Sequence, residues 1–186
     1  MSIACVILAA GLGKRMNSTL PKVLHRVCGA PMLQYVVDAA EGLKPVKKII
    51  VIGRHHDEIK GAIRGKGISY VMQKEPKGTG DALLSARGAL GNFKGTVLVL
   101  NGDIPLISTD TLKRFISHSK KSTDLLSVLS FIAEDPSAYG RILRDSSGRA
   151  MKIVEHKDAT QEQRKVREVN SGVYALRPEV LNLLAK

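Results

Sequence analysis

Two glycines and three basic residues follow a short apolar segment near the start of the chain. They lie between positions 11 and 22 and are Gly11, Gly13, Lys14, Arg15 and Lys22. A tight glycine-rich loop brings backbone N–H groups close to phosphate oxygens, and basic side chains beside it add positive charge. The pattern predicts a cradle for a triphosphate or pyrophosphate group. The alternative is an ordinary glycine turn that carries solvated basic side chains.

The spacing of these glycines differs from that of the two common phosphate-binding loops. The dinucleotide fingerprint needs a third glycine three residues after the second, where this chain has Met16. The P-loop needs a Gly-Lys-Ser/Thr triplet after a four-residue gap, and the sequence contains none. We therefore expect another kind of phosphate-binding loop.

A second polar segment runs from Gln73 to Ala82. The amide of Gln73 offers both a donor and an acceptor, so it can pair with the edge of a nucleobase. Gly78 and Thr79 precede a helical pattern, and the start of a helix presents free N–H groups. The alternative is that Thr79 simply caps this helix.

The third polar segment, 101–105, follows the apolar run 96–100. Mg²⁺ in proteins is commonly held by one or two carboxylates together with substrate phosphates. Asp103, at the end of a buried strand and beside a phosphate loop, is therefore a predicted Mg²⁺ ligand. The alternative is that Asp103 only forms a turn.

The last third of the chain carries polar residues within 139–141, 155–157 and 170–172. Glutamate and asparagine side chains suit the hydroxyl and amide groups of a sugar. Taken singly, such residues are more often surface or hairpin residues, so both interpretations stay open.

Strand and helix patterns alternate along the first two thirds of the chain. The patterns predict strands over 3–8, 47–52, 68–72, 96–100 and 125–132, and helices over 32–43, 57–64, 79–90 and 110–119. This order predicts an α/β, Rossmann-like fold with a mostly parallel, doubly wound sheet. Such sheets bind ligands at the carboxyl ends of their strands, where the three polar segments fall.

The last third follows a different pattern. Segments 141–143 and 150–155 flank a turn at 145–148, which predicts a β-hairpin insertion, and a strand over 168–176 follows. A helix over 179–185 then reaches the end of the chain without a capping glycine, so the chain is expected to be interrupted there. We expect one domain over 1–186.

Composition narrows the class of protein. The chain has 186 residues, 44% of them hydrophobic, and a formal net charge of +12. The charge is compatible with a polyanionic partner such as nucleic acid, a membrane surface or a phosphorylated substrate, or with solvated basic faces. The low aromatic content argues against single-stranded nucleic acid. No secretory or membrane-spanning segment is found, so we expect a cytoplasmic protein with reduced thiols.

Seven segments together resemble the nucleotidyltransferases that make nucleotide sugars. They are LAAGLGKRM, LPKVLH, QKEPKGTGDA, NGDIPLI, YGRI, IVEHKDAT and VNSGVYA, and they span nearly the whole chain in order. The last three are similar to a bacterial family of bifunctional uridylyltransferase–acetyltransferases that make UDP-N-acetylglucosamine. The resemblance implies the nucleotide-diphospho-sugar transferase type of fold.

The resemblance also implies roles for individual residues. The first loop holds the uridine and sugar-phosphate region through Leu8, Ala9, Ala10 and Gly11, with Gly13 in the same loop. The phosphates are contacted by Arg15 and Lys22, the uracil by Gln73, Gly78 and Thr79, and the essential Mg²⁺ by Asp103. The N-acetylglucosamine part is held by Gly140, Glu155 and Asn170.

The implied reaction converts UTP and N-acetylglucosamine 1-phosphate into UDP-N-acetylglucosamine and pyrophosphate, for cell-wall precursor synthesis. In the family the domain continues past residue 186 with an Asn that is a second metal ligand. A β-helix acetyltransferase domain follows and contributes to a homotrimer. This chain is therefore expected to be a fragment with weak or no activity. The alternatives are a sibling enzyme for another nucleotide or sugar phosphate and, more distantly, a nucleic-acid-binding domain.

Overall fold

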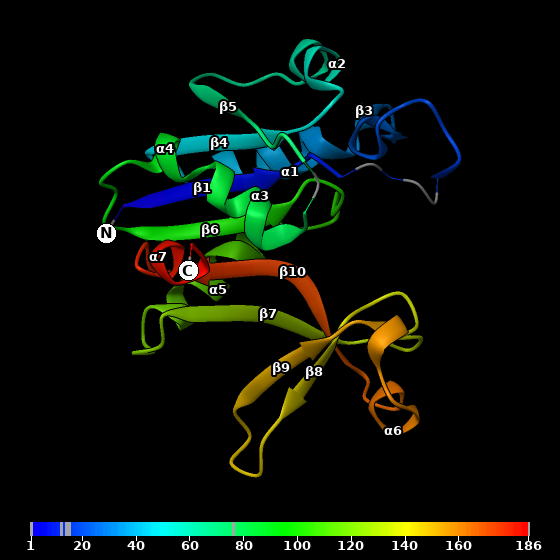
Figure 1. Ribbon diagram of the computed structural model, residues 1–186. Helices are drawn as coiled ribbons and strands as arrows, with labels where there is room; N and C mark the ends of the chain where they lie inside the picture. The colour runs from blue at the N-terminus through cyan, green and yellow to red at the C-terminus, as the bar shows by residue number, and fades with distance from the viewer. Residues whose placement is uncertain (1, 12, 14–15, 76, 186) are drawn as a thin grey trace. The chain divides into compact units, whose positions relative to one another are not determined.

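The chain folds into two compact units. The computed structural model describes residues 2–11, 13, 16–75 and 77–185 (Figure 1). The first unit comprises Met1–Ser127 with Tyr174–Lys186, and the second comprises Val128–Val173. The boundaries fall within strands β7 (Leu126–Ile132) and β10 (Glu168–Leu176), so both strands contribute residues to each unit.

A parallel sheet forms the centre of the first unit. Its order is β5-β4-β1-β6, with the strands β1 (Ile3–Leu8), β4 (Lys47–Ile52), β5 (Ile68–Met72) and β6 (Thr96–Asn101) (Figure 1). Neighbouring strands in this order are parallel. The end of β10 extends the sheet, because residues 174–176 pair antiparallel with residues 97–99 of β6. The mostly parallel sheet predicted from the sequence is confirmed.

The central strands are buried on both faces, which explains their continuous apolar runs. Residues 4–7 of β1 and 97–100 of β6 are at most 2% exposed. Each fully buried side chain of this kind contributes about 1.5–3 kcal/mol relative to an exposed one. Strands with such sequences favour the middle of a covered sheet over an edge.

Helices cover the sheet. One apolar cluster joins alternate residues of β1, β4 and β6 to α3 (Thr79–Ser85), α4 (Arg87–Leu90) and α7 (Val180–Leu184). Successive strand residues point to opposite faces, so the remaining buried strand residues face the other way. There α1 (Met32–Glu41) contacts both β1 and α5 (Thr109–Ser119). A short helix, α2 (His56–Ala62), links β4 to β5. The sheet is therefore doubly wound, as predicted.

The predicted helix over 79–90 is divided in two. The N–H of Ala86 donates to the carbonyl of Leu83, three residues back, at 3.0 Å, and this tighter turn ends α3. The helix resumes as α4 and ends at Gly91, whose φ of 55° suits a glycine. Local hydrogen bonding thus interrupts a segment whose apolar spacing is continuous.

A small hairpin near the phosphate loop was not predicted. It follows the 3-10 turn η2 (Lys22–Leu24) and consists of β2 (Arg26–Val27) and β3 (Ala30–Pro31). Its turn places Cys28 and Gly29 at positive φ. The Tyr35 hydroxyl donates to the carbonyl of Val27 at 2.7 Å and ties the hairpin to α1.

The second unit is antiparallel where its strands pair. β8 (Arg141–Arg144) and β9 (Ala150–Val154) form the predicted hairpin, and Val169 of β10 pairs with Arg141 of β8. The carboxylate of Asp145 accepts hydrogen bonds from the N–H groups of Ser147 and Arg149, which stabilises the hairpin turn. The 3-10 turn η3 (His156–Asp158) and helix α6 (Gln161–Arg164) follow β9.

The two cysteines have opposite environments. Cys5 is 0% exposed in β1, and burial, with a further contribution from nearby Glu41, raises the pKa of its thiol to about 12. Cys28 is exposed at the small hairpin turn. Among the described residues, no helix has the length and apolar character needed to cross a membrane.

Candidate functional site

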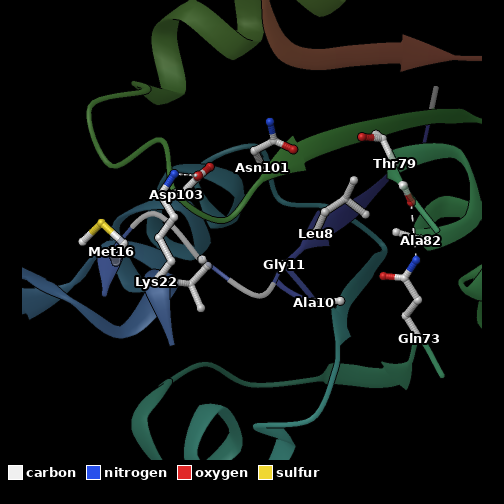
Figure 2. A pocket seen from close by; sticks show the side chains of 13 residues that line it. Leu8, Ala10, Gly11, Met16, Lys22, Gln73, Thr79, Ala82, Asn101 and Asp103 are labelled. Carbon is white, nitrogen blue, oxygen red and sulfur yellow. Dashed lines mark hydrogen bonds and ion pairs between the residues drawn. The ribbon is translucent and has the colours of Figure 1, made fainter. Parts of the chain in front are cut away.

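A pocket of about 500 Å³ lies in the first unit at the carboxyl ends of β1, β5 and β6 (Figure 2). Its lining residues are Leu8, Ala10, Gly11, Gly13, Met16, Lys22, Val23, Gln73, Gly78, Thr79, Ala82, Asn101 and Asp103. The three polar segments singled out in the sequence therefore meet in one place. The volume is in the range of small-molecule binding sites.

One sequence-predicted residue of this region, Ala9, is described by the structure and does not line the pocket. Ala9 is 4% exposed, and its N–H donates to the carbonyl of Val51 at 2.8 Å, so it anchors the loop to β4. Arg15 lies outside the described residues. The predicted contribution of Arg15 to phosphate binding therefore stays a prediction.

Gly13 shapes the phosphate loop. Its φ is +57°, and a Cβ atom there would lie 2.8 Å from the Cβ of Lys22. A side chain at this position would both strain the backbone and collide with Lys22. The carbonyl of Gly13 also accepts the N–H of Met16 at 2.8 Å. Glycine is thus what lets the loop pass close to the residue that supplies its cation.

A close approach of backbones forms the floor of the pocket beside Leu8. The N–H of Gly102 donates to the carbonyl of Leu8 at 2.9 Å, and a Cβ at Gly102 would lie 3.1 Å from that oxygen. This contact brings the loop after β6 against the end of β1. Asn101 and Asp103, on either side of Gly102, both line the pocket.

Lys22 and Asp103 form an ion pair across the pocket. The Nζ atom of Lys22 lies 2.6 Å from Oδ2 of Asp103, and Figure 2 shows the two side chains pointing toward each other. The side chains are 43% and 28% exposed, so solvent can reach both. The carboxylate of Asp103 therefore already attracts a cation. An ammonium group carries three donors, so Lys22 can contact a phosphate while it stays close to Asp103.

The donors present fit a Mg²⁺ ion that is shared with a substrate. Asp103 supplies a carboxylate to the pocket, and Asn101 supplies an amide beside it. Within the described part of the chain, no group of three or more His, Cys, Asp and Glu side chains is placed to hold a metal. A complete protein cage is not needed, because Mg²⁺ commonly takes one or two carboxylates and completes its shell with phosphates and water.

Gln73 lies at the opposite side of the pocket from this ion pair (Figure 2). It is only 6% exposed. Its Nε2 donates to Oδ2 of Asp81 at 2.7 Å and to the carbonyl of Gly78 at 3.4 Å. Asp81 is a residue that the sequence analysis did not single out. An acidic residue in the first turn of a helix is ordinarily explained by the helix dipole, so its type and position alone did not mark it.

Thr79 does not cap the helix that it begins. The N-cap of α3 is Gly78, with φ at 111°, and no side chain among the described residues caps this end. The simpler alternative for this segment, a threonine cap, is therefore not what the structure has. Thr79 instead lines the pocket together with Gly78.

Three further predicted residues gather in the second unit. The carbonyl of Gly140 accepts the N–H of Asn170 at 2.9 Å. A Cβ at Gly140 would lie 3.1 Å from Oε1 of Glu155 and 2.8 Å from a methyl carbon of Ile153. We call Gly140, Glu155 and Asn170 the Gly140 cluster. It joins the start of β8, the end of β9 and β10.

The doubly wound sheet and its glycine-rich, basic loop define a nucleotide-binding α/β protein. Its sequence also matches a known family: residues 5–169 match the family described as MobA-like NTP transferase domain. The chain belongs to this family, and it is a nucleotidyltransferase domain.

Curated relatives share much of the sequence. The bifunctional protein GlmU of Thermoanaerobacter pseudethanolicus is 44% identical over 174 residues, which cover 94% of this chain and 38% of that protein. GlmU of Bacillus licheniformis is 43% identical over 176 residues, which cover 95% and 38%. The chain thus spans about 38% of the length of these relatives.

Solved structures share the fold. A protein described as a glucose-1-phosphate thymidylyltransferase from Bacillus anthracis matches with a TM-score of 0.80 and 18% identity, over 100% of this chain and 75% of that one. UDP-glucose pyrophosphorylase complexed with UDP-glucose matches with a TM-score of 0.73 and 22% identity, over 100% and 80%. At these identities the likeness confirms the nucleotide-diphospho-sugar transferase fold.

Proposed function

We propose that the protein is a uridylyltransferase that makes UDP-N-acetylglucosamine and pyrophosphate from UTP and N-acetylglucosamine 1-phosphate. The observation that carries the proposal is the meeting of Lys22, Asp103 and Gln73 around one pocket. A cation, a carboxylate and a buried amide match a phosphate chain, a metal ion and a base. Membership of the NTP transferase family and the likeness to GlmU proteins support the same reaction.

In this proposal the pocket holds the nucleotide. Backbone groups of 8–11 and Gly13 lie along the nucleotide, and Gln73, Gly78 and Thr79 meet the uracil. Arg15 and Lys22 take up charge on the phosphates as pyrophosphate leaves. The Gly140 cluster holds the N-acetylglucosamine part, because glutamate and asparagine can bond its hydroxyl and amide groups.

The chemistry needs little from a general base. An oxygen of the sugar phosphate attacks the α-phosphorus of UTP, and the bond from that phosphorus to the bridging oxygen of the β-phosphate breaks, which releases pyrophosphate. The attacking group is already an anion. The obstacles are repulsion between two phosphates and alignment with the leaving group, so positioning and electrostatics supply the catalysis.

Asp103 and Lys22 have linked roles in this proposal. Asp103 would hold a Mg²⁺ ion, which would supply charge neutralisation for the phosphates. Lys22 pairs with Asp103 at 2.6 Å, and its ammonium group, which carries three donors, would contact the β- and γ-phosphates.

Calorimetric binding of nucleotides tests the nucleotide part of the proposal. The 186-residue chain is titrated with UTP and UDP-N-acetylglucosamine, each with and without Mg²⁺, and with CTP and dTTP for comparison. Selective binding of the uridine nucleotides is expected. Absence of binding to every nucleotide, in this chain and in a form extended to the length of its relatives, would contradict the proposal.

Turnover tests the sugar part. Pyrophosphate release is measured with UTP and either N-acetylglucosamine 1-phosphate or glucose 1-phosphate, and preference for the N-acetyl sugar is expected. The proposal includes weak turnover by this chain, a homotrimeric and cytoplasmic full-length protein, and use of the product for cell-wall precursors. Preference for glucose 1-phosphate would instead favour a sibling enzyme, and rapid turnover by the 186-residue chain would contradict the expected weakness.

A further inference from the structure

The amide of Gln73 has its two ends in different surroundings. Both acceptors that contact it, the carboxylate of Asp81 at 2.7 Å and the carbonyl of Gly78 at 3.4 Å, meet the nitrogen. A carboxylate cannot donate to an amide oxygen, so the nitrogen must face Asp81. Figure 2 shows the result: the oxygen of Gln73 points toward the Ala10 side of the pocket.

From this arrangement we infer that Asp81 is a positioning residue that selects the base. By holding the nitrogen of Gln73, it leaves an acceptor as the group presented to the nucleotide. The site therefore takes a pyrimidine that carries a hydrogen on N3. This inference rests on the proposed function and deepens it, because it names what sets the base preference of the pocket.

The chemistry of pyrimidines gives the inference its content. Uracil and thymine carry an N–H at position 3, which can donate to the oxygen of Gln73. Cytosine has a lone pair at position 3, which would face that oxygen acceptor to acceptor. A buried pair of unsatisfied acceptors is costly, so cytosine is rejected. A freely rotating glutamine would turn its nitrogen toward cytosine and lose this discrimination.

Both partners of the pair are held in place. The backbone N–H of Gln73 donates to the carbonyl of Ile52 at 2.8 Å, which fixes it against the end of β4. The backbone carbonyl of Asp81 accepts from the hydroxyl of Ser85 at 3.1 Å within α3. Because Gln73 is 6% exposed, water offers little compensation for a reversed amide. The orientation is therefore set by Asp81 rather than by solvent.

The variant Asp81→Asn tests the inference with little change in size. An asparagine can donate to the oxygen of Gln73 as readily as it can accept from the nitrogen, so the pair persists but no longer fixes its direction. Dissociation constants for UTP, CTP and dTTP are measured by calorimetry with Mg²⁺. The preference for UTP over CTP is expected to fall about tenfold or more. The ratio of UTP to dTTP is expected to stay unchanged, because both bases carry the N3 hydrogen.

Glu75→Gln is the matched control. It removes one negative charge from the same segment, from a side chain that is 69% exposed and paired with Lys77 at 2.8 Å. Loss of charge alone changes affinity for UTP and CTP together and leaves their ratio constant. A purely structural role of Asp81 would likewise weaken all nucleotides in parallel. An unchanged UTP-to-CTP ratio in a folded Asp81→Asn protein would overturn the inference.

A measurement on the unaltered protein keeps the inference testable if the variant does not fold. UTP methylated at N3 lacks the donor, and its affinity is expected to fall about tenfold or more relative to UTP. Equal binding of UTP, CTP and the N3-methyl compound would overturn the inference while leaving a nucleotide site in place. Absence of UTP binding would count against the proposed function itself, so the two failures are distinguishable.

Discussion

The nucleotide pocket and the Gly140 cluster are built on different principles. The pocket lies at the ends of parallel strands, of which β1 and β6 have central residues that are at most 2% exposed, and its lining includes Gly11, Gly13 and Gly78. The Gly140 cluster lies on antiparallel strands, and in β9 four of the five residues are not fully buried. The first region is anchored in a large core, whereas the second depends on local hydrogen bonds and exposed hairpins.

In the proposed reaction, this difference would suit the two parts of a nucleotide sugar. A phosphate chain is the same in every nucleoside triphosphate, so a rigid backbone cradle suits it. Sugars differ in a few hydroxyl and amide groups, so side chains on a separate hairpin can be exchanged without disturbing the cradle.

Removal of the carboxylate at Asp103 has the largest expected effect. In Asp103→Ala, introduced into a form extended to the length of the relatives, Mg²⁺-stimulated pyrophosphate release is expected to fall about 10³-fold, because charge between the two phosphates is no longer neutralised. Binding of UTP without Mg²⁺ is expected to stay or to strengthen, since Lys22 is freed from its 2.6 Å pair. Normal Mg²⁺ dependence in this variant would remove Asp103 from the metal site.

Truncation of a core residue measures how unequally the two regions bear stability. Leu98 lies in β6 and is 0% exposed, and Leu98→Ala is expected to lower the free energy of unfolding by about 2–5 kcal/mol. Met151 lies in β9 and is 67% exposed, and Met151→Ala is expected to lower the free energy of unfolding by less than about 0.5 kcal/mol. Urea unfolding followed by circular dichroism gives both values. Similar costs at the two positions would contradict the contrast drawn above.

Substitutions in each region are expected to separate the two substrates. Glu155→Gln should raise KM for N-acetylglucosamine 1-phosphate about tenfold, since one charged hydrogen bond to the sugar is lost, with the Kd for UTP unchanged. Gln73→Ala should raise the Kd for UTP and leave KM for N-acetylglucosamine 1-phosphate unchanged. Steady-state kinetics with calorimetry distinguishes the two effects. A higher Kd for UTP in Glu155→Gln would show that the two regions do not bind their substrates independently.

The smallest expected effect concerns pH and the second unit. The Arg144 guanidinium, at 2.7 and 2.6 Å, and the Ser130 hydroxyl, at 2.6 Å, lower the pKa of Glu168 below its ordinary value of 4.5. A lowered pKa contributes stability that is present above pH 4.5 and is lost as the pH falls through the lower, folded value. Acid should therefore weaken these contacts only as the pH falls below 4.5 and Glu168 takes up a proton.

The variant Glu168→Gln isolates this contribution. It is expected to cost about 1 kcal/mol at pH 7, because Arg144 is 45% exposed and solvent screens the pair. Its thermal midpoint should then depend less on pH below 4.5 than that of the unaltered protein. If the thermal midpoints of the two proteins fall equally steeply as the pH is lowered, another group is responsible.

Much of the fold followed from the sequence because its signals are local. The strands 3–8, 47–52, 68–72 and 168–176 have the predicted bounds, since apolar runs bordered by polar residues mark buried strands. The two-residue strands of the small hairpin have no period to detect. The break between α3 and α4 depends on one short hydrogen bond at Ala86, which apolar spacing cannot reveal.

Many of the residues that line the pocket were named from the sequence, but the contacts between them were not. Lys22 and Asp103 were each proposed from residue type and neighbours, yet only the folded sheet brings them within 2.6 Å. Asp81 was missed for a similar reason, because only the folded chain shows that its carboxylate meets the amide of Gln73. Tertiary contacts decide which polar groups meet, and these depend on the whole sheet.

The buried thiol of Cys5 can report on opening of the central sheet. With a pKa of about 12 in the central strand it stays protonated and inaccessible, whereas Cys28 is open to solvent. An alkylating reagent should label Cys28 at once and Cys5 only in molecules whose central strand has left the sheet. Mass spectrometry would then measure the rate at which Cys5 is labelled, which reports how often the sheet of the first unit opens. The same measurement with nucleotide added would show how far a bound nucleotide slows this opening.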